Sequence, residues 1–477
     1  MDLAPLFLIL LASPAAAAAV SLLPRDGVEI LASLTASVIS VLVSLLLLLS
    51  GTTGVFGYFY ADGLTRVMAI TISSIFLTSV IYSIFYVKRI KEPLIRFRWY
   101  YSLLDLFAFT MLLAITVNDL GFVWIAVEAT TVTSALLVAL ERERTSIEAA
   151  WRYTLIVSAG LVVSLLSVVL VYFSQGTFSI SDLLAKPVSN NLLMSVAVGF
   201  ALVGYGTKAG IAPMHAWLPD AHSEAPSPVS AMFSGILLPT SLYALVRTFS
   251  LLHGSLVFDA MRNLLIGFGI FTALLAALIM GNQWNYKRML AYSSMENMGI
   301  ILVGFALGGL GTVGALVQII AHAFAKSSAF YEAGNILIAF NSKSMIAVQG
   351  LIKRLKFSGY LFTISCFSIT GAPPFGVFVG EFMIISQAMK SGNVTLTILL
   401  AFAYMYAFIG LNRQAIQMVF SHRDSDLDGE QMLQSELSAQ RENLALVIIP
   451  LVNLTISLFI GISMFPVILQ AAAGLGF

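Results

Sequence analysis

The sequence predicts an all-helical polytopic membrane protein with about fourteen membrane-spanning helices, and composition is the first reason. The 477 residues are 59% hydrophobic and only 10% charged, and their mean hydropathy is +0.93. Soluble domains use about 25% charged residues, so this chain lies far outside their range. The second reason is a series of apolar runs, each with the roughly 20 residues that a helix needs to cross a bilayer.

These runs follow one another along the chain and give the expected order of helices. They cover residues 3–23, 30–50, 65–87, 100–117, 120–139, 150–173, 192–216, 228–250, 260–281, 290–308, 311–340, 357–389, 394–420 and 443–473. Most are plain Leu, Val, Ile and Ala helices, whereas the seventh, eleventh and twelfth are long and interrupted by Lys, Gly or Pro. We therefore expect those three helices to carry the chemistry.

Positive charge differs between the two sides of the expected helices. Connections after odd-numbered helices hold 16 Lys and Arg residues, and connections after even-numbered helices hold 5. Because cytoplasmic loops carry an excess of Lys and Arg, both termini are expected outside. We expect the first run to remain as a helix, since a secretory signal needs a basic leader and the only early charge is Asp2.

Two stretches pair a glycine with a proline in mid-span. Helix seven contains KAGIAPMHAW (208–217), and helix twelve contains TGAPPFGVF (370–378). An offset of five helices reverses orientation, so the two stretches would belong to inverted repeats, which place a site near the bilayer midplane. The expected parts are an N-terminal segment of helices one to three (1–99), a first repeat of helices four to eight (100–250), a second repeat of helices nine to thirteen (251–420), a polar cytoplasmic loop (421–442) and a last helix (443–477).

Each expected repeat contains a broken helix. Pro213 removes a backbone N–H five residues after Lys208, and Pro373 and Pro374 break helix twelve. Irregular backbone at membrane depth is tolerated only where protein or a water-filled cavity satisfies it, and a charged group there is expensive. We therefore interpret the break beside Lys208 as an ion site.

An acid in helix five is the natural partner of this lysine. Glu128 lies near the middle of the helix, in WIAVEATTV, where an isolated carboxylate would be neutral. The ammonium of Lys208 would keep it charged if the two side chains met. The alternative is a static ion pair that only locks two helices, although a buried pair is seldom required for stability.

Three further ionisable groups extend the row. His322 and Lys326 in helix eleven are four residues apart, so they share one face and can hand on a proton; a lone buried histidine would more simply be a satisfied hydrogen-bonding group. Glu381, in the second half of helix twelve, is placed to exchange protons with the aqueous side, or else to cap an interfacial helix. Arg413 in helix thirteen is its expected counter-charge.

The remaining polar groups give no sign of a metal or cofactor site in this chain. The loop PDAHSEAPSP holds Asp220, His222 and Glu224 at spacings that match no zinc or calcium pattern, so we expect a proton-uptake loop. Cys366 is the single cysteine, which excludes a disulfide framework and iron–sulfur ligation. The net charge of +1 provides no footprint for nucleic acid.

One long polar segment, SHRDSDLDGEQMLQSELSAQREN (421–443), separates helices thirteen and fourteen. Its second part has the pattern of an amphipathic surface helix. The simpler interpretation is a solvated cytoplasmic loop, and the sharper one is a docking surface for a partner subunit.

Four long motifs together carry a resemblance to a known family. They are GTKAGIAPMHAWLPDAHSEAPSPVSA (206–231), MLAYSSMENMGI (289–300), HAFAKSSAF (322–330) and PPFGVFVGEF (373–382). The chain resembles the proton-conducting antiporter-like subunits shared by respiratory complex I, the multi-subunit sodium/proton antiporters and the membrane-bound group 4 hydrogenases. The resemblance covers essentially all the expected helices.

The resemblance implies roles for the row of charged residues. Glu128 becomes the acid of helix five, Lys208 its lysine partner, His322 and Lys326 the central relay, and Glu381 the terminal proton-exchanging group. It also implies a prokaryotic plasma-membrane complex with other membrane subunits and a hydrophilic redox module. Iron–sulfur clusters, and a nickel–iron centre in the hydrogenase case, would lie in those partner subunits, so this chain itself would perform no redox chemistry.

The chain departs from the family pattern at two places. Where some complex I members have a lysine in helix eight, this chain has Pro239. His222 or hydroxyls such as Ser234, Thr240 and Ser241 would then have to connect the two lysines. The second departure is Glu296–Asn297 in place of a Ser–Gln pair, which is similar to the hydrogenase-type branch.

Several functions remain open from the sequence. The favoured one is an ion-translocating, most simply proton-translocating, membrane subunit of a redox-driven complex. That complex would be of group 4 hydrogenase or complex I-related type, or an archaeal relative such as a sulfane reductase. A subunit of a multi-subunit sodium/proton antiporter would use the same residues. A non-conducting structural subunit is suggested by Pro239. A transporter of organic solutes is disfavoured, since the polar row contains no aromatic box or Asn/Gln cluster.

Overall fold

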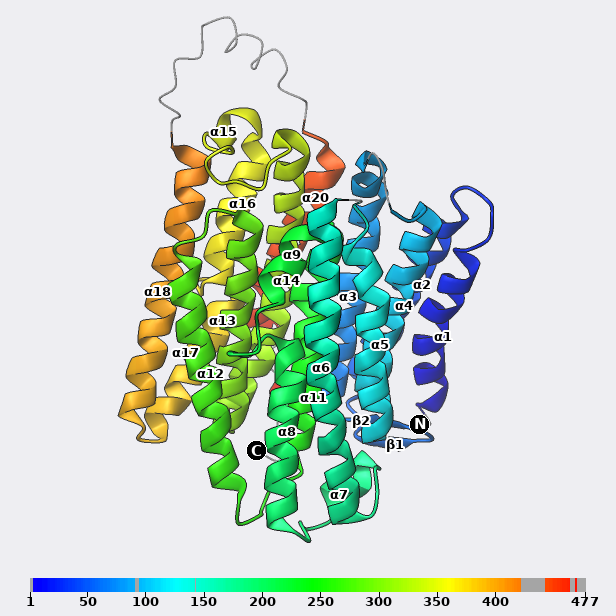
Figure 1. Ribbon diagram of the computed structural model, residues 1–477, viewed down its shortest axis with the longest axis vertical. Coiled ribbons are helices and arrows are strands. Elements are labelled where there is room, and N and C mark those ends of the chain that lie inside the picture. Colours follow the sequence, from blue (N-terminus) through cyan, green and yellow to red (C-terminus); the bar gives the residue numbers. More distant parts are fainter. Residues whose placement is uncertain (1–2, 91–93, 142, 422–441, 464–467, 470–477) are drawn as a thin grey trace, which may run out of the picture.

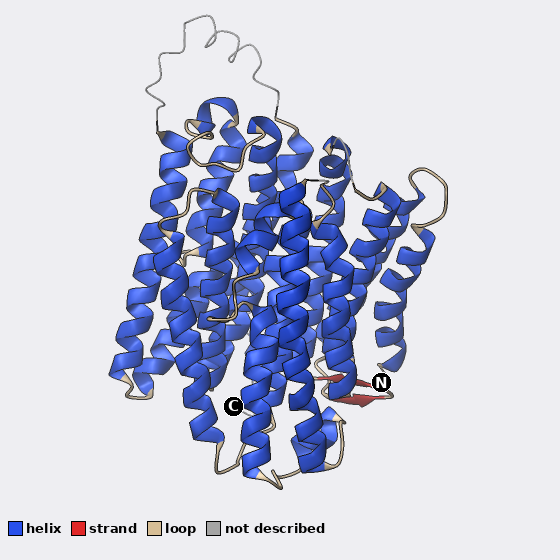
Figure 2. Ribbon diagram, in the orientation of Figure 1, coloured by secondary structure: helices blue, strands red, loops and turns tan. Residues whose placement is uncertain are grey.

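The computed structural model describes the chain except for residues 1–2, 91–93, 142, 422–441, 464–467 and 470–477. The described residues form a bundle of helices with one small antiparallel hairpin of strands β1 (Gly54–Phe56) and β2 (Phe59–Ala61) near one end (Figures 1 and 2). Most of the polar segment 421–443 lies outside the described residues, so its expected loop or docking role stays a prediction.

The helices follow the expected order. They are α1 (Ala4–Val20), α2 (Val28–Ser50), α3 (Gly63–Tyr86), the 3₁₀ turn η1 (Val87–Arg89), α4 (Phe97–Thr116), α5 (Leu120–Val138), α6 (Arg144–Gln175), α7 (Ile180–Ala185), α8 (Asn191–Ala209), α9 (Leu218–Glu224), α10 (Ser227–Met232), the π turn η2 (Phe233–Leu237), α11 (Leu238–Ser250), α12 (Phe258–Met280), α13 (Tyr286–Leu307), α14 (Leu310–Phe340), α15 (Leu351–Arg354), α16 (Lys356–Ile369), α17 (Gly376–Lys390), α18 (Val394–Phe420) and α20 (Leu444–Ser463).

Eleven stretches of the described chain are long and apolar enough to cross a membrane as helices. Two shorter apolar helices, Ala4–Val20 and Leu444–Ile460, lie near the ends of the chain, and α16 and α17 are separate pieces of the expected twelfth helix. The predicted class of all-helical multi-pass membrane protein is confirmed. The count of about fourteen spans and the two inverted repeats stay predictions.

Two of the three helices expected to be interrupted contain a break. Pro213 lies in the irregular segment between α8 and α9, and Pro373 and Pro374 lie between α16 and α17; the Ala212–Pro213 and Pro373–Pro374 bonds are cis. The eleventh expected helix differs, because α14 continues without a break through Lys326. Because α14 contains no proline, none of its residues lacks the backbone N–H that a helical hydrogen bond requires.

The backbone of the first break is satisfied by neighbouring side chains. The indole N–H of Trp217 donates to the carbonyl of Thr207 at 2.8 Å. The N–H of Ala212 donates to the Thr272 hydroxyl on α12 at 3.0 Å. Protein groups therefore replace the missing helical partners, as an irregular segment at membrane depth requires.

The centre of the bundle is formed by helices that have almost no outer face. The apolar windows of Ser227–Ser250 and Leu310–Phe340 are 100% buried, whereas that of α18 is 28% buried. Figure 1 accordingly shows α14 inside the bundle and α18 and α1 at its edges. Polar side chains on α14 are therefore enclosed by other helices and do not face lipid.

A buried ion pair that the sequence analysis did not identify anchors α3 to α11. The guanidinium of Arg247 is only 2% exposed and donates to both carboxylate oxygens of Asp62, at 2.5 and 2.6 Å. Asp62 also caps α3 by accepting from the N–H of Thr65 at 2.9 Å. Each charge therefore has a partner of opposite sign. A buried charge without such a partner would be strongly destabilising.

We predict that Arg247→Ala destabilises the protein by about 3–5 kcal/mol, because it leaves the Asp62 carboxylate buried without its counter-charge. The unfolding temperature of the detergent-solubilised protein measures the effect. The matched control is Arg262→Ala, whose ion pair with Asp259 is 38% and 76% exposed and should contribute little. Equal shifts for the two variants would contradict the prediction.

Candidate functional site

The amine of Lys208 is enclosed by protein and held by α5. Lys208 is completely buried in the last turn of α8. Its Nζ donates to the carbonyl of Val127 at 2.7 Å and to the hydroxyl of Thr131 at 2.5 Å. A positive charge near a helix C-terminus also interacts favourably with the helix dipole. Both partners accept a hydrogen bond from the amine, and neither carries a charge.

Glu128 lies between these two partners but does not form the expected ion pair with Lys208. No contact within 4 Å joins the two charged groups in the described chain, although they remain close enough to interact electrostatically. One carboxylate oxygen of Glu128 accepts from the Ser158 hydroxyl on α6 at 2.7 Å, and the other is buried without a partner. The Lys208 amine thus contacts the turn of α5 that carries Glu128, without an ion pair between the two side chains. We call this an open arrangement.

The amine of Lys326 is solvated in the same way on another helix. Lys326 is fully buried in the middle of α14. Its Nζ donates to the carbonyl of Leu290 at 2.5 Å and to the hydroxyl of Ser293, both on α13. Two lysines far apart in the sequence therefore use one backbone carbonyl and one hydroxyl each.

Both histidines of the expected relay lie close to Lys326. His322 is fully buried one turn before Lys326 and approaches the backbone of Ser234 without a well-aligned hydrogen bond. His222 is also fully buried, stacks on Phe330 with ring centroids 5.5 Å apart and interacts electrostatically with Lys326. His222 therefore packs against α14, the helix that carries Lys326, and its expected role in connecting the two lysines stays a prediction.

A π turn, η2, precedes Pro239 where the family lysine is missing. The turn carries Ser234, whose hydroxyl lies 2.7 Å from that of Ser294, the neighbour of the residue that binds Lys326. Thr240 turns its hydroxyl back to the carbonyl of Ile236 at 2.7 Å, so it is engaged within its own helix. π turns occur often at functional sites. Ser234 therefore remains a relay residue in our interpretation, and Thr240 is a weaker one.

The two acids of the expected uptake loop take part in ion pairs. Asp220 contacts Arg152 at 3.2 Å and also pairs with Arg288. Glu224 pairs with Lys343 at 2.9 Å and accepts from the Thr145 hydroxyl at 3.0 Å. These contacts tie α9 to α6, to α13 and to the segment after α14.

Electrostatics at Glu224 favour its charged form. Burial opposes ionisation, but the Lys343 ammonium and the hydrogen bonds from Lys343 and Thr145 outweigh it and hold the pKa of the Glu224 carboxyl below its ordinary value of 4.5. The expected proton-uptake role of Asp220 and Glu224 stays a prediction, and the observed contacts give both residues a structural role.

Glu381 lies at the second break. The side chain is 6% exposed on the first turns of α17, and its carboxylate packs against Gly371, whose φ is +67°. A Cβ at Gly371 would overlap the carboxylate. The expected counter-charge is not found, because Arg413 is exposed and forms no ion pair in the described chain. Its neighbour Asn412 instead donates to the Thr370 hydroxyl at 2.8 Å.

Two buried residues beside this break were noted from the sequence only as marks of a family branch. Glu296 is 1% exposed and Asn297 is fully buried, both on α13. The amide of Asn297 donates to the Glu296 carboxylate at 2.7 Å, and its oxygen accepts from Gln318 on α14 at 2.9 Å. The rule that an intramembrane acid marks a functional site would have identified Glu296.

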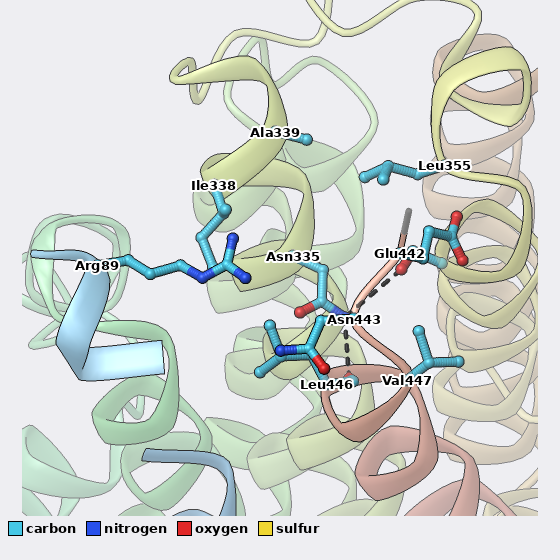
Figure 3. Close-up of a pocket in the computed structure, with 10 residues that line it drawn as sticks. Arg89, Asn335, Ile338, Ala339, Leu355, Glu442, Asn443, Leu446 and Val447 are labelled. Atoms are coloured by element: carbon cyan, nitrogen blue, oxygen red, sulfur yellow. Dashed lines mark hydrogen bonds between the residues drawn. The ribbon is translucent and has the colours of Figure 1, made fainter. Parts of the chain in front are cut away.

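A separate cavity of about 190 Å³ lies at one end of the bundle and contains none of the expected relay residues (Figure 3). Its lining consists of Arg89, Asn335, Ile338, Ala339, Leu355, Ser358, Glu442, Asn443, Leu446 and Val447. Asn335 donates to the carbonyl of Leu446 at 3.0 Å across its floor. In the described part of the chain, no three or more His, Cys, Asp or Glu side chains gather in a way that could hold a metal ion.

The sequence is similar to membrane subunits of several complexes. A family profile described as "NADH:quinone oxidoreductase/Mrp antiporter, TM" matches residues 117–420, more than half of the chain. The hydrogenase-4 component F homolog of Methylacidiphilum infernorum is 32% identical over 77% of this chain and 80% of its own length. NADH-quinone oxidoreductase subunit M of Escherichia coli is 33% identical over 57% of this chain, and the alignment spans only 55% of that longer protein.

Solved structures of two complexes contain chains with the same fold. One belongs to the membrane-bound sulfane sulfur reductase, an archaeal respiratory membrane complex, with a TM-score of 0.86 and 21% identity over 100% of this chain and 98% of that one. The other belongs to the Mrp complex from Dietzia sp. DQ12-45-1b, with a TM-score of 0.84 and 20% identity over 100% and 98%. At these identities the likeness concerns the fold.

We predict that the Glu224–Lys343 pair stabilises the protein only while Glu224 is charged. Because its folded pKa lies below 4.5, the contribution is fully present above that pH and is lost as the pH falls through the folded value. The free energies of unfolding of the wild type and Glu224→Gln should therefore differ by a constant amount, on the order of 1 kcal/mol, near neutral pH. The difference should shrink below pH 4.5; a difference that grows on acidification would contradict the assignment.

We predict that Gly371→Ala destabilises the protein more than Gly392→Ala does. Both glycines have positive φ, +67° and +73°, so both variants incur the left-handed backbone cost of about 1–2 kcal/mol. Only at Gly371 would the added methyl meet the Glu381 carboxylate, whereas nothing lies within 4 Å at Gly392. The collision should add about 1–3 kcal/mol in thermal unfolding, and equal costs would show that Glu381 does not occupy this position.

Proposed function

Because the chain belongs to the NADH:quinone oxidoreductase/Mrp antiporter transmembrane family, we propose that it is the proton-translocating membrane subunit of a redox-driven complex. The resemblance found in its motifs is thereby confirmed. The observation that carries the proposal is the pair of fully buried lysines, Lys208 and Lys326, each held by one carbonyl and one hydroxyl of a neighbouring helix. A buried lysine with this little compensation is unfavourable as a purely structural element.

The open arrangement at α5 suggests how Lys208 gains and releases its proton. The Lys208 amine contacts the turn of α5 that carries Glu128, but it forms no ion pair with that residue, whose free carboxylate oxygen has no partner. Direct contact would favour the ammonium form, and separation would favour release of its proton. A redox-driven movement in a partner subunit that alters the separation of Glu128 and Lys208 would thus load and unload this lysine.

The proton then has a route across the bundle. The His322 ring lies one turn before Lys326, and the Ser234 hydroxyl contacts that of Ser294, next to the Ser293 that holds Lys326. Both groups can accept and donate a proton on the way to that lysine. Glu381 at the second break is the exit group in this scheme. Helices α10, α11 and α14 enclose the route and exclude lipid from it.

The proposed setting is a prokaryotic plasma membrane, with both termini outside and the basic loops in the cytoplasm. The excess of Lys and Arg on one side supports this orientation, and Figure 1 places the α1–α2 connection and α15 at one end of the bundle. The hydrogenase-4 relative supports partners that include other membrane subunits and a hydrophilic redox module. Iron–sulfur clusters, and a nickel–iron centre if the module is a hydrogenase, would lie in those partners.

Lysine variants in the assembled complex test the proposal. Lys208→Ala and Lys326→Ala should each reduce redox-coupled proton translocation into sealed vesicles by about tenfold or more, because each removes a group that accepts and donates the proton. The control is Lys390→Ala, which changes an exposed lysine at the end of α17. Translocation is measured with a pH-sensitive dye while the cognate donor is oxidised.

The other outcomes of this experiment distinguish the remaining functions. Unchanged coupling in both lysine variants would overturn the proposal and indicate a structural subunit. Sodium-dependent pH changes in the absence of any electron donor would instead indicate a sodium/proton antiporter.

A further inference from the structure

We propose that Glu296 on α13 is an additional proton-carrying residue, placed between Lys326 and Glu381. This inference rests on the proposed function and adds a step that neither the motifs nor the resemblance assigned. It depends on three contacts: one at Glu296 itself, one at the second break and one at Lys326.

The first contact directs Glu296 toward the second break. The Asn297 amide that donates to the Glu296 carboxylate at 2.7 Å also reaches the carbonyl of Ile369 at 3.4 Å. Ile369 is the last residue of α16, immediately before the irregular segment. The Glu296–Asn297 pair therefore lies against the point where the expected twelfth helix is broken.

Glu381 meets the same break from the opposite helix. Its carboxylate packs against Gly371, two residues beyond Ile369. The neighbouring Gly380 allows α17 to approach α14 closely, because a Cβ there would lie 2.8 Å from the Cβ of Gln318. Gln318 is the residue whose amide donates to Asn297. One short network thus connects the α13 acid to the turn of α17 that carries the second acid.

Lys326 approaches Glu296 along α13. Its partners Leu290 and Ser293 lie six and three residues before Glu296. Residues three and four apart on a helix share a face, so Ser293 and Glu296 project on the same side of α13. Electrostatic interactions between Lys326 and Glu296, and between Glu296 and Glu381, agree with this order.

The arrangement repeats the one at the first lysine. At α5, a carbonyl and a hydroxyl that hold Lys208 flank Glu128. At α13, a carbonyl and a hydroxyl that hold Lys326 lie within two turns of Glu296. Both lysines are therefore bound to a helix that also carries a buried or half-buried acid, although the sequence motifs of the two helices differ.

The proposed step conserves protons and involves no electrons. The Lys326 ammonium gives one proton to the Glu296 carboxylate, leaving a neutral amine and a carboxylic acid. Glu296 then gives that proton to the Glu381 carboxylate across the break and becomes a carboxylate again. The net result is the movement of one proton from Lys326 to Glu381.

The test replaces the acid by its amide in the complete complex. Glu296→Gln keeps the size of the side chain and should reduce redox-coupled proton translocation in sealed vesicles by about tenfold or more, because it removes the proton-carrying group. The matched control is Asp105→Asn, another fully buried acid, which is held by the hydroxyls of Ser21 and Ser33 and lies outside the route. The control should keep its coupling if the complex assembles.

A spectroscopic measurement separates proton transfer from a structural role. Redox-induced infrared difference spectra should contain a carboxyl C=O band that Glu296→Gln removes and Asp105→Asn retains. Glu296→Asp should shift this band and keep part of the translocation, and it also decides the matter if the amide variant fails to assemble. A residue that only supports the fold would give no such band.

The results also distinguish this inference from the proposed function. Translocation in Glu296→Gln within about twofold of the wild type, together with loss of translocation in Lys326→Ala, would overturn the role of Glu296 alone. An unchanged C=O band in Glu296→Gln would do the same. If Lys208→Ala, Lys326→Ala and Glu296→Gln all kept full coupling, the proposed function itself would fail.

Discussion

A lysine amine enclosed by helices must be solvated by protein groups, and this constraint underlies the arrangement of the bundle. The amines of Lys208 and Lys326 each contact one main-chain carbonyl and one hydroxyl. A carbonyl oxygen has two lone pairs, so a carbonyl within a helix can keep its helical hydrogen bond and still accept from the lysine. Neither α5 nor α13 has to break in order to hold a charge, and both remain continuous.

The two broken helices meet the same requirement with different chemistry. At the first break, the partners of the backbone are the neutral side chains of Trp217 and Thr272. At the second break, the neighbours include the carboxylates of Glu296 and Glu381 as well as Asn297. The side chains that satisfy the backbone of the first break are therefore neutral, whereas two carboxylates that can bind a proton lie beside the second break.

Much of this arrangement could be predicted from the sequence, because it follows from hydropathy and from proline. The helical membrane class, the two breaks and the burial of Lys208 and Lys326 depend on local composition. The open geometry of Glu128 could not be predicted, since it depends on which side of α5 meets α6 and α8. The Arg247–Asp62 pair, joining residues 185 positions apart, and the π turn before Pro239 likewise arise from tertiary packing.

The enclosed acids of the bundle differ in the number of hydrogen bonds that hold them. Asp62 receives both arms of Arg247 and a backbone N–H, and Asp105 receives two hydroxyls. Asp62 is therefore held in its charged form by several hydrogen bonds, whereas the second oxygen of Asp105 is buried without a partner in the described chain. Glu128 and Glu296 each receive one side-chain donor in the described chain. An acid with one donor can change its protonation while losing little of the surrounding network, and both of these acids lie beside a lysine.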